Sequence, residues 1–590
     1  MPANKNNGHD AAGQGFKAHP LQYPVLRYSN LIEALEGAPG ERPFVTFWVD
    51  EDEQETVTFA EFRRRARLQA GALRGQGATC GDRVVIVMPQ DIPAMTVFAG
   101  AMMLGAVPAF LAYPNEKVDP TKYRSGLAGV TANLKAKLVV IDRDFPEEMI
   151  GCVSLDEEAT LVRAADTRDG SAVEIVPNVL TEINSAAFIQ HSAGTTGLQK
   201  GVALTHGAVL RQLEHLTRAL DIDGAKDSIY SWLPLYHDMG LIACFMLPVV
   251  RHIPVVMQSP VDWVMRPESM LQVISEHKCT LAWMPNFAFQ FVPRRTRPNR
   301  RAQYDLSSVR ALINCSEPVR ASSMKEFQDA FGVCGLKPGA LQSSYAMAEN
   351  VFAVTQSDPQ SSSGPARLWA DGSVFRSSHQ LVTSAEGTPG SICFASSGRL
   401  LPHHEIRIVS EAGSDLPNGA VGEILVKSDC LFEGYYNRPD LTEKAIVDGW
   451  YHTGDLGFRM EEKLFVVGRK KDLIIVGGEN LYPQDIEEIV ASHPAIHDGR
   501  VIALGLYNPD LGTEEILVVA EVEREELLAD AEVIEREIRS RIAAGLGVTA
   551  GTILLKPPKW IVKSTAGKAA RSTTLEKLKK EHPELNIGGV

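Results

Sequence analysis

A stretch between positions 192 and 201 concentrates residue types that bind phosphate. It reads Ser-Ala-Gly-Thr-Thr-Gly-Leu-Gln-Lys-Gly and so brings hydroxyl groups, glycines and one lysine together. Glycine lets the backbone approach a ligand closely, and the ammonium of Lys200 supplies a point charge. Residues 186–189 predict a buried strand before the stretch, and Thr205 can cap a helix after it. Strand, glycine-rich turn and helix together aim N–H groups and hydroxyls at polyphosphate oxygens.

An ordinary flexible loop is the alternative interpretation of this stretch, because Gly, Ser and Thr are common in loops. A Walker loop is excluded by spacing, since the pattern Gly-x-x-x-x-Gly-Lys-Ser/Thr does not occur here. The function therefore depends on the other motifs of the chain.

Composition limits the classes of protein to which the chain can belong. With 590 residues the chain is too long for one core, so we expect two or more domains. A net charge of -14 argues against nucleic acid or an anionic membrane as a general partner. The eight cysteines are scattered without a Cys-x-x-Cys pair, which predicts a reduced, cytoplasmic protein without a zinc site. Residues 1–19 are polar and predict a disordered segment, not a secretory signal.

One apolar segment is long enough to span a bilayer, because residues 92–115 carry no charge. Glycines and prolines interrupt this segment, and its flanks show no basic bias. We therefore predict a buried helix followed by a strand, with no membrane span.

Strands that alternate with helices predict an α/β fold with a largely parallel sheet. The expected strands include residues 82–88, 137–141, 281–284 and 309–314, with an amphipathic helix at 60–73. From about residue 390 the pattern changes to short strands, such as 405–409 and 422–426, which predicts a β-rich subdomain over about 390–468.

A separate α+β domain is predicted at the C-terminal end. Its expected elements are strands at 473–476, 500–506 and 515–522, a helix near 483–490, and a helix carrying Ile534, Ile538 and Ile542. We place the boundary at 469–472, which divides the chain into residues 1–19, a large domain 20–470 and a small domain 471–590.

Two further motifs could hold a nucleoside. In Ser344-Tyr345-Ala346-Met347-Ala348-Glu349, the tyrosine ring could stack on a base and the Glu349 carboxylate could hold Mg²⁺ between phosphates. In Tyr451-His452-Thr453-Gly454-Asp455, a carboxylate on a glycine-containing turn could accept both ribose hydroxyls. Each motif also has a plain interpretation: a core tyrosine with a helix-starting glutamate, and a common Thr-Gly-Asp turn.

Near the C-terminus, Lys563-Ser564-Thr565-Ala566-Gly567-Lys568 contains a second glycine-flanked lysine. A basic tail is the alternative, as for Lys577, Lys579 and Lys580 nearby.

Taken together and in this order, the motifs resemble those of the adenylate-forming enzymes: acyl-CoA synthetases, nonribosomal-peptide adenylation domains, luciferases and fatty acyl-AMP ligases. The resemblance covers roughly residues 30–580. It implies a large N-terminal domain of parallel-rich sheets with helices, a mobile α+β C-terminal domain, and the cofactors ATP and Mg²⁺.

The resemblance also implies roles for individual residues. ATP phosphates would contact Ser192, Gly194, Thr195, Thr196, Gly197 and Lys200. Adenine would lie among Ser316, Glu317, Ser344, Tyr345, Ala346 and Met347, and the ribose would contact Asp455 and Arg469. Mg²⁺ would be held by Thr196 and Glu349, and Lys471 would be the hinge. Of the two catalytic residues, Lys568 would reach the reacting phosphate and carboxylate, and His237 would lie beside the acyl tunnel.

Three features favour the fatty acyl-AMP ligase branch: the string 235–240, the continuation 348–352 after Tyr345, and a possible insertion at 357–391. The implied reaction is a fatty or other apolar acid plus Mg·ATP giving acyl-adenylate and pyrophosphate. The acyl group would then pass to an acyl carrier protein, or to a carrier domain of a polyketide or peptide synthetase, on a separate chain. One alternative is an acyl-CoA synthetase. A more distant one is a non-catalytic nucleotide-binding regulator, which has no need of Lys200, Glu349, Asp455 and Lys568 together.

Overall fold

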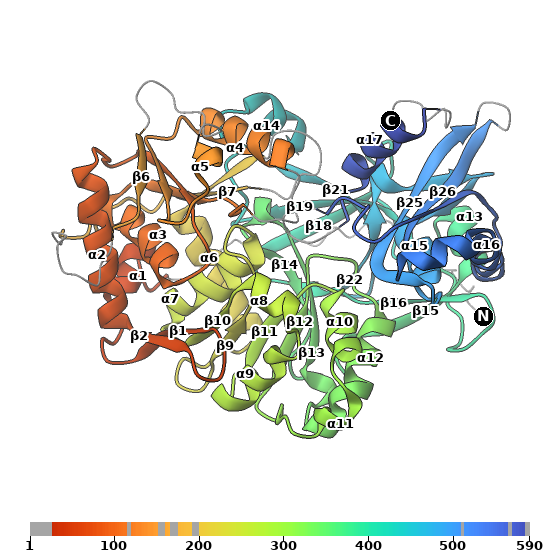
Figure 1. Ribbon diagram of the computed structural model, residues 1–590, viewed down its shortest axis with the longest axis horizontal. Coiled ribbons are helices and arrows are strands. Elements are labelled where there is room, and N and C mark those ends of the chain that lie inside the picture. The colour runs from red at the N-terminus through yellow and green to blue at the C-terminus, as the bar shows by residue number, and fades with distance from the viewer. Residues whose placement is uncertain are drawn as a thin grey trace, which may run out of the picture.

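The structure is a computed structural model that describes residues 26–114, 120–150, 160–165, 175–191, 200–508, 512–563 and 569–583. The predicted N-terminal disordered segment, residues 1–19, lies outside them. A large N-terminal body, red through green to teal and light blue in Figure 1, lies beside a smaller C-terminal body drawn in blue.

The parallel half of the largest sheet forms the centre of the N-terminal body. Its strands are buried at nearly every position, as expected for parallel strands covered on both faces. In spatial order they are β13 (Leu341–Ala346), β12 (Ala311–Asn314), β11 (Leu281–Met284), β9 (Ile229–Ser231), β10 (Val255–Gln258) and β1 (Pro43–Trp48), with β2 (Gln54–Thr58) antiparallel at the edge.

Beyond β13 the same sheet becomes antiparallel. The further strands are β14 (Ala353–Gln356), β17 (Gly398–Leu400), β22 (Lys463–Arg469), β21 (Trp450–Met460), β19 (Gly422–Ser428) and β18 (His404–Val409), and β20 (Ile446–Val447) pairs with β21. The region predicted to be β-rich is thus hydrogen-bonded to the parallel strands in one sheet, which the sequence could not show because strand pairing is non-local.

A second, four-stranded parallel sheet has the order β4 (Val107–Phe110), β3 (Arg83–Val87), β5 (Leu138–Ile141) and β6 (Thr160–Arg163). The charge-free segment forms α3 (Ile92–Leu104) and β4, which confirms the predicted buried helix and strand. A Cβ on Gly100 would lie 2.6 Å from the Ala66 carbonyl oxygen, so α3 packs closely on α2 (Phe59–Gly75). Among the described residues, no helix combines the length and apolar character of a membrane span.

The glycine-rich stretch differs from the predicted strand–turn–helix unit. It joins β7 (Ala186–His191) to a second strand, β8 (Gly201–Thr205), and the two pair in antiparallel fashion before α6 (His206–Ala219) begins. The prediction missed β8 because the five residues of that strand are too few for a distinct pattern. Thr205 caps α6 as predicted, since its hydroxyl accepts the Ala208 N–H at 3.1 Å.

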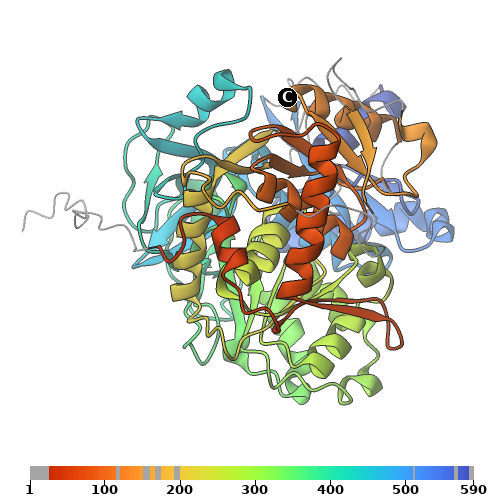
Figure 2. The same ribbon diagram turned by 90° about the vertical axis from the view of Figure 1, so that its left-hand side faces the viewer.

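The remaining helices of the N-terminal body cover the sheets, and the red helices α1 and α2 face the viewer in Figure 2. They are α1 (Leu31–Glu36), α4 (Pro120–Leu134), α5 (Glu147–Ile150), α7 (Leu247–Arg251), α8 (Pro260–Met265), α9 (Ser269–His277), α10 (Ala288–Arg295), α11 (Pro298–Arg301), α12 (Ala321–Phe331) and α14 (Pro439–Ala445).

The C-terminal body contains the predicted strands and helices around a core of its own. Its elements are β23 (Ile474–Val476), β24 (Glu479–Leu481), α15 (Pro483–Ala491), β25 (Ile496–Asn508), β26 (Thr513–Val522), α16 (Ala531–Leu546), β27 (Ala550–Lys556) and α17 (Arg571–Glu581). Ile534, Ile538 and Ile542 of α16 are buried in this core, as the helical spacing predicts.

The possible insertion is structured and contacts the C-terminal body. It forms β15 (Arg367–Asp371), which pairs with β16 (Ser391–Ala395), and α13 (Gly372–Ser378), all of which lie near α15 and α16 in Figure 1. Phe375 of α13 is 1% exposed and lies 4.7 Å from Phe394 between ring centroids. The segment therefore shares an aromatic core with the large domain.

Candidate active site

Three residues predicted to hold the nucleoside converge beside the antiparallel part of the sheet. The Tyr345 hydroxyl donates to Asp455 Oδ2 at 2.6 Å, and Arg469 Nε lies 3.3 Å from Asp455 Oδ1. Asp455 and Arg469 are register partners on β21 and β22, while Tyr345 projects from β13. Tyr345 is more than a hundred positions from Asp455 and Arg469 in the sequence, yet the three side chains lie in contact.

The backbone around Tyr345 is fixed by a buried polar network. The Tyr345 N–H donates to Thr355 Oγ1 at 3.2 Å, and the Thr355 hydroxyl donates to the Ser397 carbonyl at 2.6 Å. Ser344 donates to the Thr355 carbonyl at 2.7 Å. Ala346 and Met347 follow half-buried at the end of β13. The ring of Tyr345 is therefore held by strand pairing and not by a mobile loop.

Asp455 has an unusual electrostatic setting for a binding carboxylate. Burial raises its pKa above the ordinary aspartate value, whereas the Arg469 charge and the Tyr345 hydroxyl both lower it. The motif was predicted to lie on a turn, but Thr453, Gly454 and Asp455 lie within β21. Gly454 has φ +68°, so the strand is locally irregular at this point. A glycine permits that conformation, which explains why the motif has the composition of a turn. The turn itself precedes β21, at 448–449.

Lys200 and Glu349 meet around a tyrosine that the sequence analysis did not single out. The Lys200 ammonium lies 4.5 Å from the ring centroid of Tyr435, and the Tyr435 hydroxyl donates to Glu349 Oε1 at 2.7 Å. The Phe432 N–H donates to the Glu349 carbonyl at 2.8 Å. A carboxylate in this position supplies the hard oxygen ligand that Mg²⁺ prefers, so Glu349 fits the predicted metal role.

The predicted second face of the adenine pocket lies directly after β12. Ser316 adopts φ +68°, and Glu317 accepts the Phe287 N–H at 2.9 Å. Ser316 Oγ lies 3.8 Å from Met239 Sδ, which places this loop against the segment that follows His237.

His237 lies just before a π-helix, Met239–Met246, whose residues are all buried. Its Nδ1 lies 2.5 Å from Asp238 Oδ1, and its side chain is 16% exposed. Residues 241–257 and 283–287, predicted to line an acyl tunnel, are mostly part of the buried core. Trp232 stacks on Trp263 with ring centroids 3.6 Å apart, and Phe287 lies 6.2 Å from each of the two rings.

Six predicted site residues cannot be placed. Ser192, Gly194, Thr195, Thr196, Gly197 and Lys568 lie outside the described residues. The flanks of both segments are described: β7 and β8 pair on either side of 192–199, and Lys563 and Ala569 form an antiparallel bridge on either side of 564–568. Lys568 therefore directly precedes a residue that is held by backbone pairing.

Comparison with known proteins identifies the family of the chain. A family profile described as "AMP-binding enzyme" matches residues 32–436. The chain belongs to the AMP-binding enzyme family. It is 30% identical to a 4-hydroxyphenylalkanoate adenylyltransferase of Mycobacterium bovis, with 95% of this chain and 94% of that protein covered. It is also 30% identical to the long-chain-fatty-acid–AMP ligase FadD26 of Mycobacterium marinum, with 94% and 97% covered.

Among solved structures, one from work on the fatty acyl-adenylate ligases of E. coli and L. pneumophila matches this AMP-binding enzyme with a TM-score of 0.86. The identity is 26%, and the match covers 96% of this chain and all of that one. The predicted family and fold class are thereby confirmed.

The sequence analysis gives no role to Lys563, the first lysine of the C-terminal motif in this AMP-binding enzyme. Burial lowers the pKa of Lys563 to about 8, and the negative charge of Glu317 is among the influences that raise it. The loop before Lys563 is anchored by the buried Glu521, which accepts the N–H groups of Lys559 at 2.9 Å and Ile561 at 2.6 Å. The Lys563 ammonium therefore lies within electrostatic range of the Glu317 carboxylate.

Ion pairs join the N-terminal body to the C-terminal body. Arg320 Nη1 lies 2.7 Å from Asp485 Oδ1 and 3.3 Å from Glu488 Oε2, and Arg294 lies 2.5 Å from Asp498. Lys471, the predicted hinge, lies in a 3₁₀ turn, Lys470–Asp472, between β22 and β23. The only described backbone link between the bodies runs through this turn.

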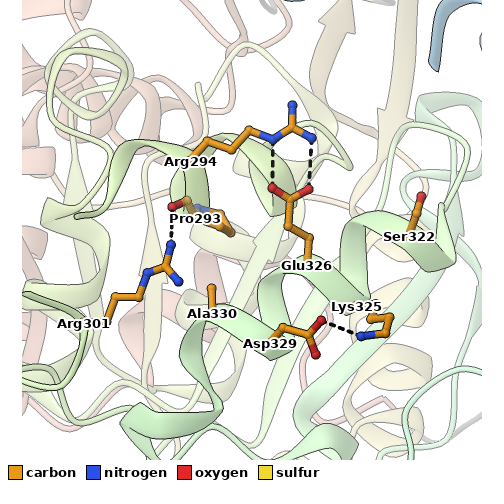
Figure 3. Close-up of a pocket in the computed structure, with 8 residues that line it drawn as sticks. All are labelled: Pro293, Arg294, Arg301, Ser322, Lys325, Glu326, Asp329 and Ala330. Carbon is orange, nitrogen blue, oxygen red and sulfur yellow. Dashed lines mark hydrogen bonds and ion pairs between the residues drawn. The ribbon is translucent and has the colours of Figure 1, made fainter. Parts of the chain in front are cut away.

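A surface pocket of about 490 Å³ lies over α10 and α12, and Arg294 is one of its lining residues (Figure 3). Its charged side chains pair with one another: Arg294 contacts Glu326 through two hydrogen bonds, and Lys325 contacts Asp329. It shares no lining residue with the predicted site, so we do not assign the chemistry to it.

Proposed function

We propose that this AMP-binding enzyme activates a fatty or other apolar carboxylic acid to an acyl-adenylate and releases pyrophosphate from Mg·ATP. The observation that carries the proposal is the unit of Tyr345, Asp455 and Arg469, with a stacking ring, a ribose-binding carboxylate and a cation in contact. The relatives named as adenylyltransferase and as fatty-acid–AMP ligase support the same reaction.

In the proposed binding mode, Tyr345 stacks on adenine with Ser316 and Glu317 on the other face, and Asp455 and Arg469 hold the ribose. Lys200 and the glycine-rich stretch contact the β- and γ-phosphates. Glu349 and Thr196 would hold Mg²⁺, and the metal would supply positive charge against the phosphates.

The chemistry requires in-line attack of the acid carboxylate on the α-phosphorus. The protein contributes by positioning the two reactants and by stabilising the charge that develops on the phosphate. Lys568 is the proposed cation for that charge. His237 is proposed to border the acyl group.

The proposal also names the thiol that accepts the acyl group. We propose that the acyl group is transferred to the phosphopantetheine thiol of an acyl carrier protein or of a polyketide or peptide synthetase. This carrier would be a separate chain, and the reaction would take place in the cytoplasm. The support is the contact between α13 and the C-terminal body, which opposes rotation about Lys471. We propose residues 20–470 and 471–590 as the two domains, with 357–391 as the insertion between strands of the first.

ATP–pyrophosphate exchange across a panel of acids tests the proposal. Each buried methylene contributes about 0.8 kcal/mol, so exchange at low acid concentration rises with chain length until the apolar space is full. Acetate or an amino acid as the best substrate would contradict it. Rapid acyl-CoA synthesis by the unmodified protein would favour an acyl-CoA synthetase, and nucleotide binding without exchange would favour a regulator.

A further inference from the structure

We infer that Tyr435 is a positioning residue, which orients the metal-binding carboxylate of Glu349 and holds the ammonium of Lys200 beside it. The inference rests on the proposed roles of Glu349 and Lys200. Lys200 Nζ lies over the Tyr435 ring, 4.5 Å from its centroid, and the Tyr435 hydroxyl donates to Glu349 Oε1 at 2.7 Å. A single side chain thus contacts a phosphate-binding group and a metal-binding group.

The backbone of Glu349 has little freedom, because the turn that carries it is tightly fixed. Val351 adopts φ +62° and ψ −54°, a conformation that a β-branched residue rarely takes. The Phe352 N–H donates to the Asn350 carbonyl at 2.6 Å, which closes a three-residue γ-turn around Val351. Such a strained turn persists only where its surroundings hold it in place.

Asn350 supplies much of that restraint. It is fully buried, and its Nδ2 donates to the Ala353 carbonyl at 2.8 Å and to His404 Nε2 at 2.9 Å. The Ser428 hydroxyl donates to Asn350 Oδ1 at 2.5 Å. His404 Nδ1 faces the Pro402 carbonyl, which can only accept, so Nε2 of the neutral ring is the acceptor for Asn350.

With its backbone fixed, Glu349 keeps only the freedom of its side-chain torsions. The bond from Tyr435 restricts these torsions and engages one carboxylate oxygen, as an outer-sphere donor does for a metal ligand.

Tyr435 is itself tied to the end of the glycine-rich stretch. Val202 of β8 pairs with Tyr435 in an antiparallel bridge, and the Tyr436 N–H donates to the Gly201 carbonyl at 2.7 Å. The described end of the phosphate-binding stretch and the metal-binding carboxylate are therefore held in register by one segment.

The test is equilibrium binding of a non-hydrolysable ATP analogue by the full-length protein over a titration of Mg²⁺. Loss of an outer-sphere partner typically weakens metal affinity by about 10- to 100-fold, so we expect Tyr435→Phe to raise the half-saturating Mg²⁺ concentration about tenfold. Tyr435→Leu removes the aromatic face as well, and we expect it to weaken nucleotide binding also in the absence of Mg²⁺.

Tyr451→Phe is the matched control, because the Tyr451 hydroxyl is also buried and lies 3.4 Å from that of Tyr435. We expect it to leave the Mg²⁺ dependence within twofold of wild type. Asn350→Asp, which removes the N–H donors of Asn350 at constant shape, should act in the same direction as Tyr435→Phe. Glu349→Gln serves as the reference.

A wild-type Mg²⁺ dependence in Tyr435→Phe, together with a strong effect of Glu349→Gln, would overturn the inference and leave the proposed function intact. No effect of Glu349→Gln would overturn the assignment of Glu349 to the metal, and the inference with it.

Discussion

The Tyr345 hydroxyl lies 2.6 Å from Asp455 Oδ2, so the proposed base-stacking ring and the proposed ribose-binding carboxylate form one hydrogen-bonded unit. Arg469 holds the other carboxylate oxygen at 3.3 Å. The ring proposed to stack on adenine therefore also influences the charge of the carboxylate proposed to bind ribose.

This relationship predicts a pH effect. Burial raises the pKa of Asp455, so its carboxylate is lost on acidification at a higher pH than for an exposed aspartate, and nucleotide binding weakens accordingly. The Tyr345 hydroxyl lowers that pKa by stabilising the carboxylate. Tyr345→Phe, which keeps the ring, should move the acid limb of nucleotide affinity to higher pH.

The measurement is the Kd for ATP between pH 4.5 and 7, with Tyr451→Phe as the control for loss of a buried hydroxyl. An acid limb that stays in place or moves to lower pH in Tyr345→Phe would show that the bond does not tune Asp455.

The contact between the insertion and the C-terminal body predicts how the acceptor is chosen. Asn480 Nδ2 donates to the Arg376 carbonyl at 3.1 Å, and Tyr482 Oη lies 3.3 Å from His379 Nε2. Each such bond contributes about 1 kcal/mol, so removing both favours domain rotation by roughly 30-fold. We expect Asn480→Ala/Tyr482→Phe to increase acyl-CoA formation with adenylation unchanged within about twofold.

Point variants are preferable to deletion of 357–391, because Phe375 packs in a core with Phe394 and Phe458 that a deletion would uncover. Ser377→Ala is the control, since its hydroxyl bonds only within α13 among the contacts described. If the double variant makes no more acyl-CoA than Ser377→Ala does, the insertion does not restrain the acceptor step.

The 3₁₀ turn between the bodies predicts a hinge phenotype for Lys471. Proline fixes φ near about −65°, so Lys471→Pro should block a rotation that needs a large change in φ. We expect thiol transfer to fall at least about tenfold while adenylation stays within about threefold. Lys471→Ala removes the charge but keeps the rotation, and an equal loss of transfer in that variant would assign the effect to the ammonium.

Much of the fold was accessible from local sequence patterns. The buried helix and strand of the charge-free segment, the cap at Thr205 and the isoleucines of α16 each depend on nearby residues, and each prediction is confirmed. The strand β8 was missed because its pattern is short, and the continuous sheet was missed because strand pairing joins residues far apart in the chain.

The candidate site was accessible only in part. Tyr345 and Asp455 lie in short motifs that indicate nucleotide binding, and only the resemblance to the adenylate-forming enzymes adds Arg469. Tyr435 has no such signal: it contacts Lys200 and Glu349 only in the folded chain, and in the sequence it is simply one of two adjacent tyrosines. The lowered pKa of Lys563 likewise arises from burial that no local pattern records.

Lys568 is proposed to act in the chemical step, so its loss should slow adenylation without weakening ATP binding. Removal of one preorganised charge stabiliser typically lowers a rate by about 10²- to 10³-fold, and we expect Lys568→Ala to lower adenylation to this extent. ATP affinity should change little, because Tyr345, Asp455 and Lys200 remain. Lys580→Ala, an exposed lysine of α17, is the control. Exchange at the wild-type rate in Lys568→Ala would remove this lysine from the mechanism.

Isolation of the first product tests the central claim most directly. The full-length protein is mixed with Mg²⁺, α-phosphate-labelled ATP and a medium-chain fatty acid, and the products are separated and identified by mass spectrometry. The account predicts that labelled acyl-AMP and unlabelled pyrophosphate form in equal amounts. Formation of both products should require the acid and should fall strongly in Asp455→Ala. Label recovered as ADP, or as AMP at the same rate without the acid, would contradict it.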